Sequence, residues 1–347
     1  MSANKSYRSH KNTDGEVDFE FYPIIRKYKD GRIERFTTSS FVPASADPAT
    51  SHGDGVATRD VVIDQGTVVS VRLFLPSQAT AAGTRLPLVV YVHGGSFCTQ
   101  SAFSRTYHRY ATSLAASAGA LIVSVEYRLA PEYPVPAAYN DTWAALRWVA
   151  TLSDPWLAEY ADPRRTFLAG DSAGGNIVYH MAIRATHDDS IMDIEGLVIV
   201  HPFLWGLERL PAEKVSDGDV MYPPALVDKL WPFVTAGQAG NDDPRINPPD
   251  EEIALLTCRR VMVCVAGRDT LRDRGRRFAS RMRKCGWTDR NLTVLESEGE
   301  DHLFHLYTPL RDTSKDLMDR IVRFINDRAT LPSPNHSDPR SLWRAAL

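Results

Sequence analysis

Several features that would define a class of protein are missing from this sequence. No stretch approaches the roughly 18–20 consecutive apolar residues of a membrane span, and the first residues lack the apolar core of a secretory signal. The 40 lysines and arginines are balanced by 43 aspartates and glutamates, so no basic surplus indicates binding to nucleic acid or to an anionic membrane. We therefore expect a protein of the cytoplasm, with the nucleus as a second location, that binds neither.

Cysteine is also scarce. Four cysteines occur in 347 residues, and no two of them have the C-x-x-C spacing of a zinc or redox motif. This pattern argues against a disulfide framework and predicts reduced thiols. Hydrophobic residues make up 43% of the chain, near the average for globular proteins. A chain of this length can bury a large core without cross-links, so we expect a globular fold.

Between polar ends, the sequence pattern predicts one large domain. Residues 1–17 are predicted to be disordered, residues 18–328 to form a single domain, and residues 329–347 to be a loose tail. Short apolar runs typical of buried strands occupy residues 61–63, 68–75, 86–93, 120–126, 166–169, 196–201, 260–267 and 292–296. Helical spacing lies between them at residues 104–117, 140–152, from 174 onward, 269–285 and 314–326. This alternation predicts an α/β fold with a mostly parallel sheet and helices on both faces.

Two segments interrupt the alternation. The N-terminal segment, residues 18–58, contains Asp30 and Gly31, a dipeptide typical of a hairpin turn. The other segment, residues 203–249, is rich in tryptophan and proline and lies between two strands. An irregular insertion of this length in a compact domain is more often a lid or binding loop than idle chain.

Residues 170–174, with the sequence GDSAG, form the strongest local motif. They follow an apolar run and precede a helical pattern, which is the context of a nucleophile elbow. Small residues on either side of Ser172 permit the sharp turn that lifts its hydroxyl above the sheet. A glycine-rich helix start would look similar, so the motif needs support from elsewhere in the chain.

That support comes from residues 93–97, with the sequence HGGSF, which also follow a buried strand. Glycines in this position leave backbone N–H groups free to point at a developing oxyanion. Together with the N–H of Ala173, those of Gly94 and Gly95 would form an oxyanion hole. Two such motifs, each directly after a strand, favour Ser172 as a catalytic nucleophile.

A nucleophilic serine needs a histidine base and an acid that orients it, in the order Ser, acid, His along an α/β chain. Asp269 directly follows the strand at 260–267, and His302 lies in a loop after the strand at 292–296. We therefore predict the triad Ser172, Asp269 and His302. The rivals are His305 as the base and Asp273 or Asp301 as the acid. His93 is expected to hold the oxyanion loop and His180 to pack under the sheet, and no acid follows His201 in the required order.

These motifs make a family resemblance visible. HGGSF, YRLAPE at 127–132 and GDSAGGN resemble the hormone-sensitive-lipase-like branch of the α/β-hydrolases. FYPIIRKYKDGRIERF, DPRINP at 243–248, GRDTLRD and GEDHLFHLY resemble plant carboxylesterases, a group that includes the gibberellin receptor. The resemblance covers about residues 20–328. It implies an α/β-hydrolase core with a cap built from the N-terminal segment and the insertion after Phe203, and it supports the same triad and oxyanion hole.

The function expected from the residues and the resemblance is a serine carboxylesterase. It would cleave a small apolar or aromatic ester through an acyl-enzyme, without a metal or organic cofactor, as a monomer or a homodimer. One alternative is a gibberellin-receptor-like ligand-binding protein. The receptors share Ser96 in place of a third glycine, but they lack a histidine at the position of His302. Another alternative is a dehydratase or cyclase that acts on a specialised plant metabolite in the same pocket.

Several residues are candidates for contacts around the substrate. We expect the set Ser96, Phe97, Asp171, Phe203 and Trp205 to bind substrate, with Asp171 also bracing the nucleophile turn. Arg128 and Glu132 would form a buried ion pair behind the oxyanion loop.

Overall fold

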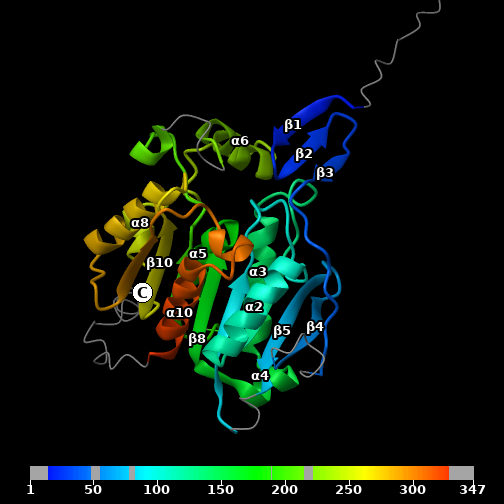
Figure 1. Ribbon diagram of the computed structural model, residues 1–347, viewed down its shortest axis with the longest axis vertical. Helices are drawn as coiled ribbons and strands as arrows, with labels where there is room; N and C mark the ends of the chain where they lie inside the picture. The colour runs from blue at the N-terminus through cyan, green and yellow to red at the C-terminus, as the bar shows by residue number, and fades with distance from the viewer. Residues whose placement is uncertain (1–14, 48–54, 78–82, 189, 215–221, 328–347) are drawn as a thin grey trace, which may run out of the picture.

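The computed structural model describes residues 15–47, 55–77, 83–188, 190–214 and 222–327. Within them, the main sheet has eight strands and forms the centre of the molecule (Figure 1). In spatial order these are β11 (Leu292–Ser297), β10 (Arg260–Ala266), β9 (Ile194–Val200), β8 (Ala161–Asp171), β6 (Leu86–Val92), β7 (Leu121–Glu126), β5 (Val69–Pro76) and β4 (Val56–Asp64). Residues 1–14 of the segment predicted to be disordered, 1–17, lie outside the described residues, as does the whole predicted tail, 329–347.

The sheet is mostly parallel, as the sequence predicted. Within the described part of this eight-stranded sheet, only β4 with β5 and β5 with β7 pair antiparallel. The neighbours from β7 through β6 to β11 all pair parallel. Every residue of β6 and β10 is buried. Strands with helices on both faces have no solvated side, which is why their sequences are continuous apolar runs.

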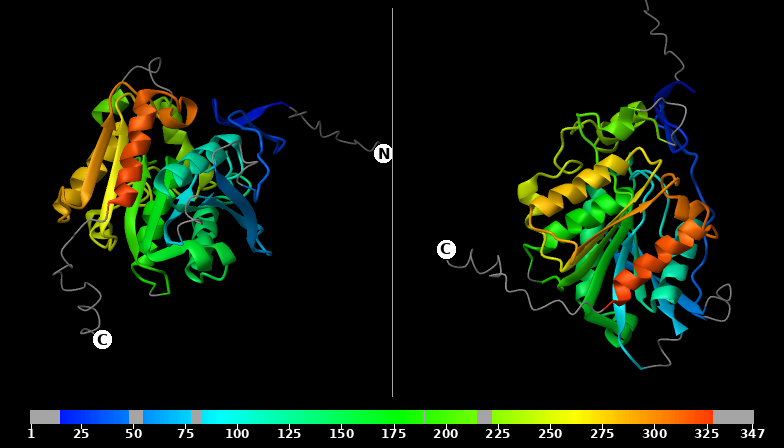
Figure 2. Two further views of the ribbon diagram at one scale, coloured as in Figure 1. Left: turned by 60° about the horizontal axis from the view of Figure 1, so that its bottom comes forward. Right: turned by 60° about the vertical axis from the view of Figure 1, so that its left-hand side comes forward.

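Helices cover both faces of the sheet (Figure 2). On one face α2 (Arg105–Ala118), α9 (Phe304–Tyr307) and α10 (Asp312–Asn326) share a buried cluster with the strands. On the other face the packed helices are α3 (Ala137–Ala150), α5 (Ala173–Ala185) and α8 (Arg272–Lys284), and the short α4 (Pro155–Tyr160) and α7 (Asp250–Ile253) contribute to the same cluster. The predicted layers are confirmed.

The N-terminal segment folds into a separate small sheet at the top of the molecule in Figure 1. Its strands are β1 (Val17–Phe21), β2 (Ile25–Tyr28) and β3 (Ile33–Arg35). The predicted turn joins β2 to β3, and Gly31 takes a positive φ of 89° there. One side of this sheet contacts the insertion, because Phe19 stacks on Phe233 with ring centroids 3.7 Å apart.

The insertion after Phe203 is not irregular throughout, contrary to the sequence-based expectation. It contains the 3₁₀ turn η1 (Pro211–Lys214) and the helix α6 (Pro224–Val234). Proline in the first turn suits a helix start, and the buried Val227, Leu230, Trp231 and Val234 have the spacing of one helix face. Together, α6 and the three-stranded sheet form the cap. No helix among the described residues is long and apolar enough to cross a membrane.

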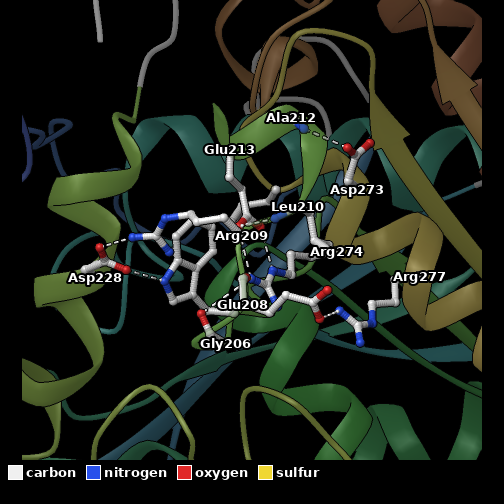
Figure 3. Close-up of polar contacts among 12 residues, drawn as sticks. Gly206, Glu208, Arg209, Leu210, Ala212, Glu213, Asp228, Asp273, Arg274 and Arg277 are labelled. Carbon is white, nitrogen blue, oxygen red and sulfur yellow. Dashed lines mark hydrogen bonds and ion pairs between the residues drawn. The ribbon is translucent and has the colours of Figure 1, made fainter. Parts of the chain in front are cut away.

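An ion-pair cluster joins the insertion to α8 (Figure 3). The guanidinium of Arg274 donates to both carboxylate oxygens of Glu213, and the two side chains are 3% and 0% exposed. Beside this pair, a carboxylate oxygen of Asp273 accepts the N–H of Ala212 at 2.7 Å. The start of α8 therefore holds the segment around η1 through the buried Arg274–Glu213 ion pair and the hydrogen bond from Ala212 to Asp273.

Removal of Arg274 should show how much this buried pair stabilises the fold. Arg274→Ala leaves the Glu213 carboxylate buried without its partner, and we expect a loss of about 3–5 kcal/mol in the free energy of unfolding. Arg277→Ala is the matched control, since Arg277 lies on the same helix but pairs with Glu208 at the surface, with side chains 42% and 65% exposed; that change should cost about 0–1 kcal/mol. Equal losses in denaturant unfolding would contradict this assignment.

Candidate active site

Ser172 occupies the turn between β8 and α5, in a backbone conformation that few residues adopt. Its φ is 52° and its ψ −117°. The turn closes tightly, because a Cβ on Gly174 would stand only 2.0 Å from the carbonyl oxygen of Val92 at the end of β6. The N–H of Ser172 donates to the carbonyl of Val200 at 2.9 Å, which ties the turn to β9. The geometry is that of a nucleophile elbow.

The structure brings Ser172, Asp269 and His302 together from three separate strand ends. Nε2 of His302 lies 3.0 Å from Oγ of Ser172, and Nδ1 of His302 lies 2.7 Å from Oδ2 of Asp269. The other carboxylate oxygen, Oδ1, accepts the N–H of Leu271 at 2.9 Å, which fixes the orientation of the Asp269 carboxylate. All three side chains are buried.

Burial and charge act in opposite directions on His302. Burial disfavours the charged imidazolium, but the charge of Asp269 and its hydrogen bond outweigh it, so the pKa of His302 is raised above its usual value. An imidazole with a raised pKa is a stronger base toward a serine hydroxyl.

The alternative candidates for the base and the acid make other contacts in the structure. Neither ring nitrogen of the buried His305 has a hydrogen-bond partner among the described residues, and burial lowers its pKa to about 3. The carboxylate of Asp273 accepts the N–H of Ala212 in the insertion and does not contact His302 or His305 in any hydrogen bond among the described residues. Asp301 accepts the N–H of His302 through Oδ1 at 2.7 Å, so it holds the backbone of that residue and not its ring.

The oxyanion loop departs from expectation at Gly94. Its N–H donates to the hydroxyl of Tyr107 at 2.9 Å, so the single donor of Gly94 already has a partner inside the protein. Gly95 has a φ of 100°, and a Cβ there would lie 2.3 Å from the carbonyl oxygen of Thr99. The loop therefore requires glycine at this position, and Gly95 and Ala173 remain the expected donors to an oxyanion.

His93 supports this loop from within. Its Nδ1 lies 2.8 Å from the carbonyl oxygen of Gly94, and its ring stacks on Tyr127 at a centroid distance of 4.2 Å. The Tyr127 hydroxyl donates to the carbonyl of His93 at 2.9 Å. Burial lowers the pKa of His93 to about 4, so the ring is neutral at ordinary pH.

Asp171 was expected both to contact substrate and to brace the nucleophile turn, and the structure buries it completely in a bracing position. Its carboxylate accepts hydrogen bonds from the hydroxyls of Tyr91 and Tyr107. Burial raises the pKa of Asp171 to about 6, although the two hydroxyls oppose that shift. Tyr107 therefore links the carboxylate beside the nucleophile to the N–H of Gly94, a role that the sequence alone did not reveal.

Two tyrosine substitutions should separate bracing from catalysis. Tyr107→Phe leaves both Asp171 and the Gly94 N–H short of a partner, and we expect a stability loss of about 1–3 kcal/mol and a fall in kcat of about tenfold, equal to about 1.4 kcal/mol of barrier. Tyr91→Phe removes only the bond to Asp171. It should lower stability similarly and leave kcat nearly unchanged, as measured by denaturant unfolding and ester hydrolysis. A larger loss of kcat in Tyr91→Phe would refute this division of roles.

An aromatic cluster joins the oxyanion loop to the cap. Phe97 packs edge-on against Phe203 and Trp231, at centroid distances of 5.8 and 5.6 Å. Tyr222 stands edge-on to the ring of His302 at 5.3 Å and stacks on Phe21 from β1 at 5.8 Å. Trp231 and Tyr222 could not be predicted as neighbours of the site, because the sequence of the insertion has no periodic pattern strong enough to orient their side chains.

Other expected contacts differ in the structure. Trp205 is fully buried. Its Nε1 donates to Asp228 at 2.9 Å, and the guanidinium carbon of Arg274 lies 5.1 Å from its ring centroid. It is thus part of the cap's own packing. Ser96 follows Gly95 with a φ of 56° and is 9% exposed; its contact with substrate stays a prediction.

The predicted ion pair between Arg128 and Glu132 is wrong. Arg128 pairs with Asp141 on α3, through bonds of 2.7 and 2.9 Å. Glu132 pairs with Arg35 of β3, which also donates to the carbonyl of Cys98. The two residues are four apart in an irregular loop, so their side chains leave in different directions and each finds a partner that is distant in sequence.

His201, Asp269 and His302 offer ligand atoms within 4.8 Å of one another, a spacing that invites comparison with a metal site. The donor set does not fit a metal well. Nδ1 of His201 accepts the N–H of Leu303 at 3.0 Å, so the ring proton sits on Nε2 and no lone pair remains. The other two residues hydrogen-bond to each other.

Comparison with known proteins agrees with this geometry. A family model described as the alpha/beta hydrolase fold matches residues 89–306. The chain belongs to this family, and within it to the plant carboxylesterases. It is similar to a protein named probable carboxylesterase 4, mitochondrial, from Arabidopsis thaliana, with 41% identity over 90% of this chain and 85% of the relative. That name gives a mitochondrial location, whereas cytoplasm or nucleus stays our prediction here.

Two other similar proteins widen the range of chemistry. One is a 2-hydroxyisoflavanone dehydratase from Glycyrrhiza echinata, 40% identical over 90% of this chain and 97% of the relative. The other is a solved structure of an esterase from Pyrobaculum calidifontis, 26% identical with a TM-score of 0.65, covering 77% of this chain and 84% of that chain. Proteins similar to this chain are thus named both as esterases and as a dehydratase.

Proposed function

We propose that this protein is a serine carboxylesterase that hydrolyses small esters with apolar or aromatic groups. The observation that carries the proposal is the continuous contact from Ser172 through His302 to Asp269, with both hydrogen bonds at 3.0 Å or less. A serine hydroxyl, a base and an orienting acid in this order perform acyl transfer. The aromatic side chains Phe97, Phe203 and Tyr222 near the site support an apolar or aromatic substrate.

In the proposed reaction, His302 accepts the proton of Ser172 through Nε2 as Oγ attacks the ester carbonyl. Asp269 keeps the other ring proton on Nδ1 and stabilises the imidazolium that forms. The N–H groups of Gly95 and Ala173 bind the oxyanion. His302 then gives its proton to the departing alcohol, and a water molecule activated by the same ring releases the acid from the acyl-enzyme.

The similar dehydratase favours a second candidate, in which the same base removes a proton and water leaves the substrate. Product analysis separates the two reactions, because hydrolysis yields an acid and an alcohol whereas elimination yields one unsaturated product and water. A receptor-like binding protein fits less well, since it would have no use for the contact between His302 and Ser172.

The central test is hydrolysis of p-nitrophenyl esters, from acetate to octanoate, by wild type and Ser172→Ala. Loss of the nucleophile should lower kcat at least about 10⁴-fold and leave the fold intact, which thermal unfolding checks. His302→Ala should fall to a similar level, because the two residues act as one unit. Hydrolysis retained by Ser172→Ala would exclude this serine as the nucleophile.

The pH profile tests the role of Asp269. Because the base must be neutral, kcat/KM should rise with pH through the raised pKa of His302, above the usual value of about 6.5. Asp269→Asn removes the charge that raises this pKa, while burial still lowers it. We expect the acid limb to move to lower pH and kcat to fall by about 10⁴-fold. An unmoved limb would show that the base is coupled to another acid.

A further inference from the structure

His201 lies at the end of β9, close to the catalytic residues, and the proposed reaction gives it no role. Its side chain is buried, with 1% exposure, and its ring centroid lies 5.8 Å from that of His302. Nδ1 of His201 accepts the N–H of Leu303 at 3.0 Å. Leu303 is the residue directly after the base, so this contact reaches the backbone that carries His302.

The backbone of Leu303 has a strained conformation, which hydrogen bonds from neighbouring side chains stabilise. Its φ is 55° and its ψ is 25°, a left-handed backbone conformation that residues other than glycine rarely adopt. It marks the sharp turn between His302 and α9. Nδ1 of His201 fixes the N–H on one side of this turn, and Oδ1 of Asp301 fixes the N–H of His302 on the other.

The same short segment also fixes the nucleophile. The carbonyl of Val200 accepts the N–H of Ser172, and the carbonyl of Ser172 accepts the N–H of Phe203, both at 2.9 Å. Between these two backbone bonds stands His201, whose own N–H donates to Cys264 of β10 at 2.8 Å. Residues 200–203 therefore contact the nucleophile through the backbone and the base loop through one side chain.

The His201 ring serves as a hydrogen-bond acceptor through Nδ1. Because Nδ1 accepts from a backbone N–H, the proton must sit on Nε2, and Nε2 is buried with no hydrogen-bond partner among the described residues. A buried donor without a partner is costly and calls for a reason. The groups that face the ring are His302, Phe304, His305 and Asp269.

We propose that His201 is a positioning residue for the esterase reaction: its Nδ1 holds the Leu303 N–H and thereby sets the direction of the His302 ring toward Ser172 and Asp269. The proposal rests on the proposed function. It predicts that the acceptor atom matters, beyond the volume that the ring fills.

Asparagine and leucine at position 201 form the matched pair that tests this. They share the same branched side-chain skeleton, but only asparagine offers an oxygen near the place of Nδ1. His201→Leu should lower kcat between about 10- and 100-fold, since small misplacement of a catalytic group costs that much, with KM changed little. His201→Asn should recover kcat to within a few-fold of wild type. Both variants should be compared at equal numbers of active sites, counted by titration with an organophosphate.

Two readouts distinguish positioning from mere loss of stability. The acid limb of kcat/KM should move to lower pH in His201→Leu, because the His302 ring is then poorly oriented toward Asp269, whose charge raises its pKa. In His201→Asn the limb should stay in place. The low-field proton resonance of His302 Nδ1–H should weaken in the leucine variant alone, a measurement that needs no turnover. Equal kcat, pH limb and resonance in the two variants would overturn the proposal.

The outcomes also separate this proposal from the proposed function. If wild type hydrolyses esters and Ser172→Ala does not, the function stands whatever position 201 does. If wild type hydrolyses none, the function fails, and the resonance in the two His201 variants still decides whether this side chain orients His302.

Discussion

The close approach of the nucleophile turn to the end of β6 is the constraint on which the site depends. Gly174 meets the carbonyl of Val92 so tightly that no side chain fits between them. This contact sets the first turn of α5, which begins at Ala173, beside the loop after β6 that contains Gly95. The parallel order of β6, β8, β9 and β10 then delivers the remaining groups to the same edge, because parallel strands end together.

Residues that follow a strand directly could be predicted from the sequence. Ser172 and Asp269 each come after an apolar run, and His302 lies in the loop after the last one, so chain order and strand ends were sufficient to bring them together. The layers of the fold were predictable for the same reason, since short apolar runs and helical spacing alternate. These signals are local, and every one of them is visible within about ten residues.

Contacts between distant side chains could not be predicted in this way. Tyr107, in the first turn of α2, accepts the N–H of Gly94, and Arg128 pairs with Asp141 instead of Glu132, which is nearer in sequence. Helix α6 was missed because prolines obscured its pattern, although proline is compatible with a first turn. Each of these depends on which face of an element meets its neighbour, and that is set by packing across the whole domain.

Burial shifts the pKa values of the polar groups around this site, and the cap contributes to that burial. Tyr222, in the insertion, packs edge-on against His302, and the Thr270 hydroxyl beside Asp269 donates to the carbonyl of Tyr222 at 2.8 Å. Four residues further on, Arg274 holds the other side of the insertion through Glu213. The acid and the cap are therefore anchored on the same short stretch of chain, from Asp269 into α8. A change that loosened this stretch would admit water to His302 and disturb its acid together, so the position of the cap and the basicity of the histidine are linked through one element.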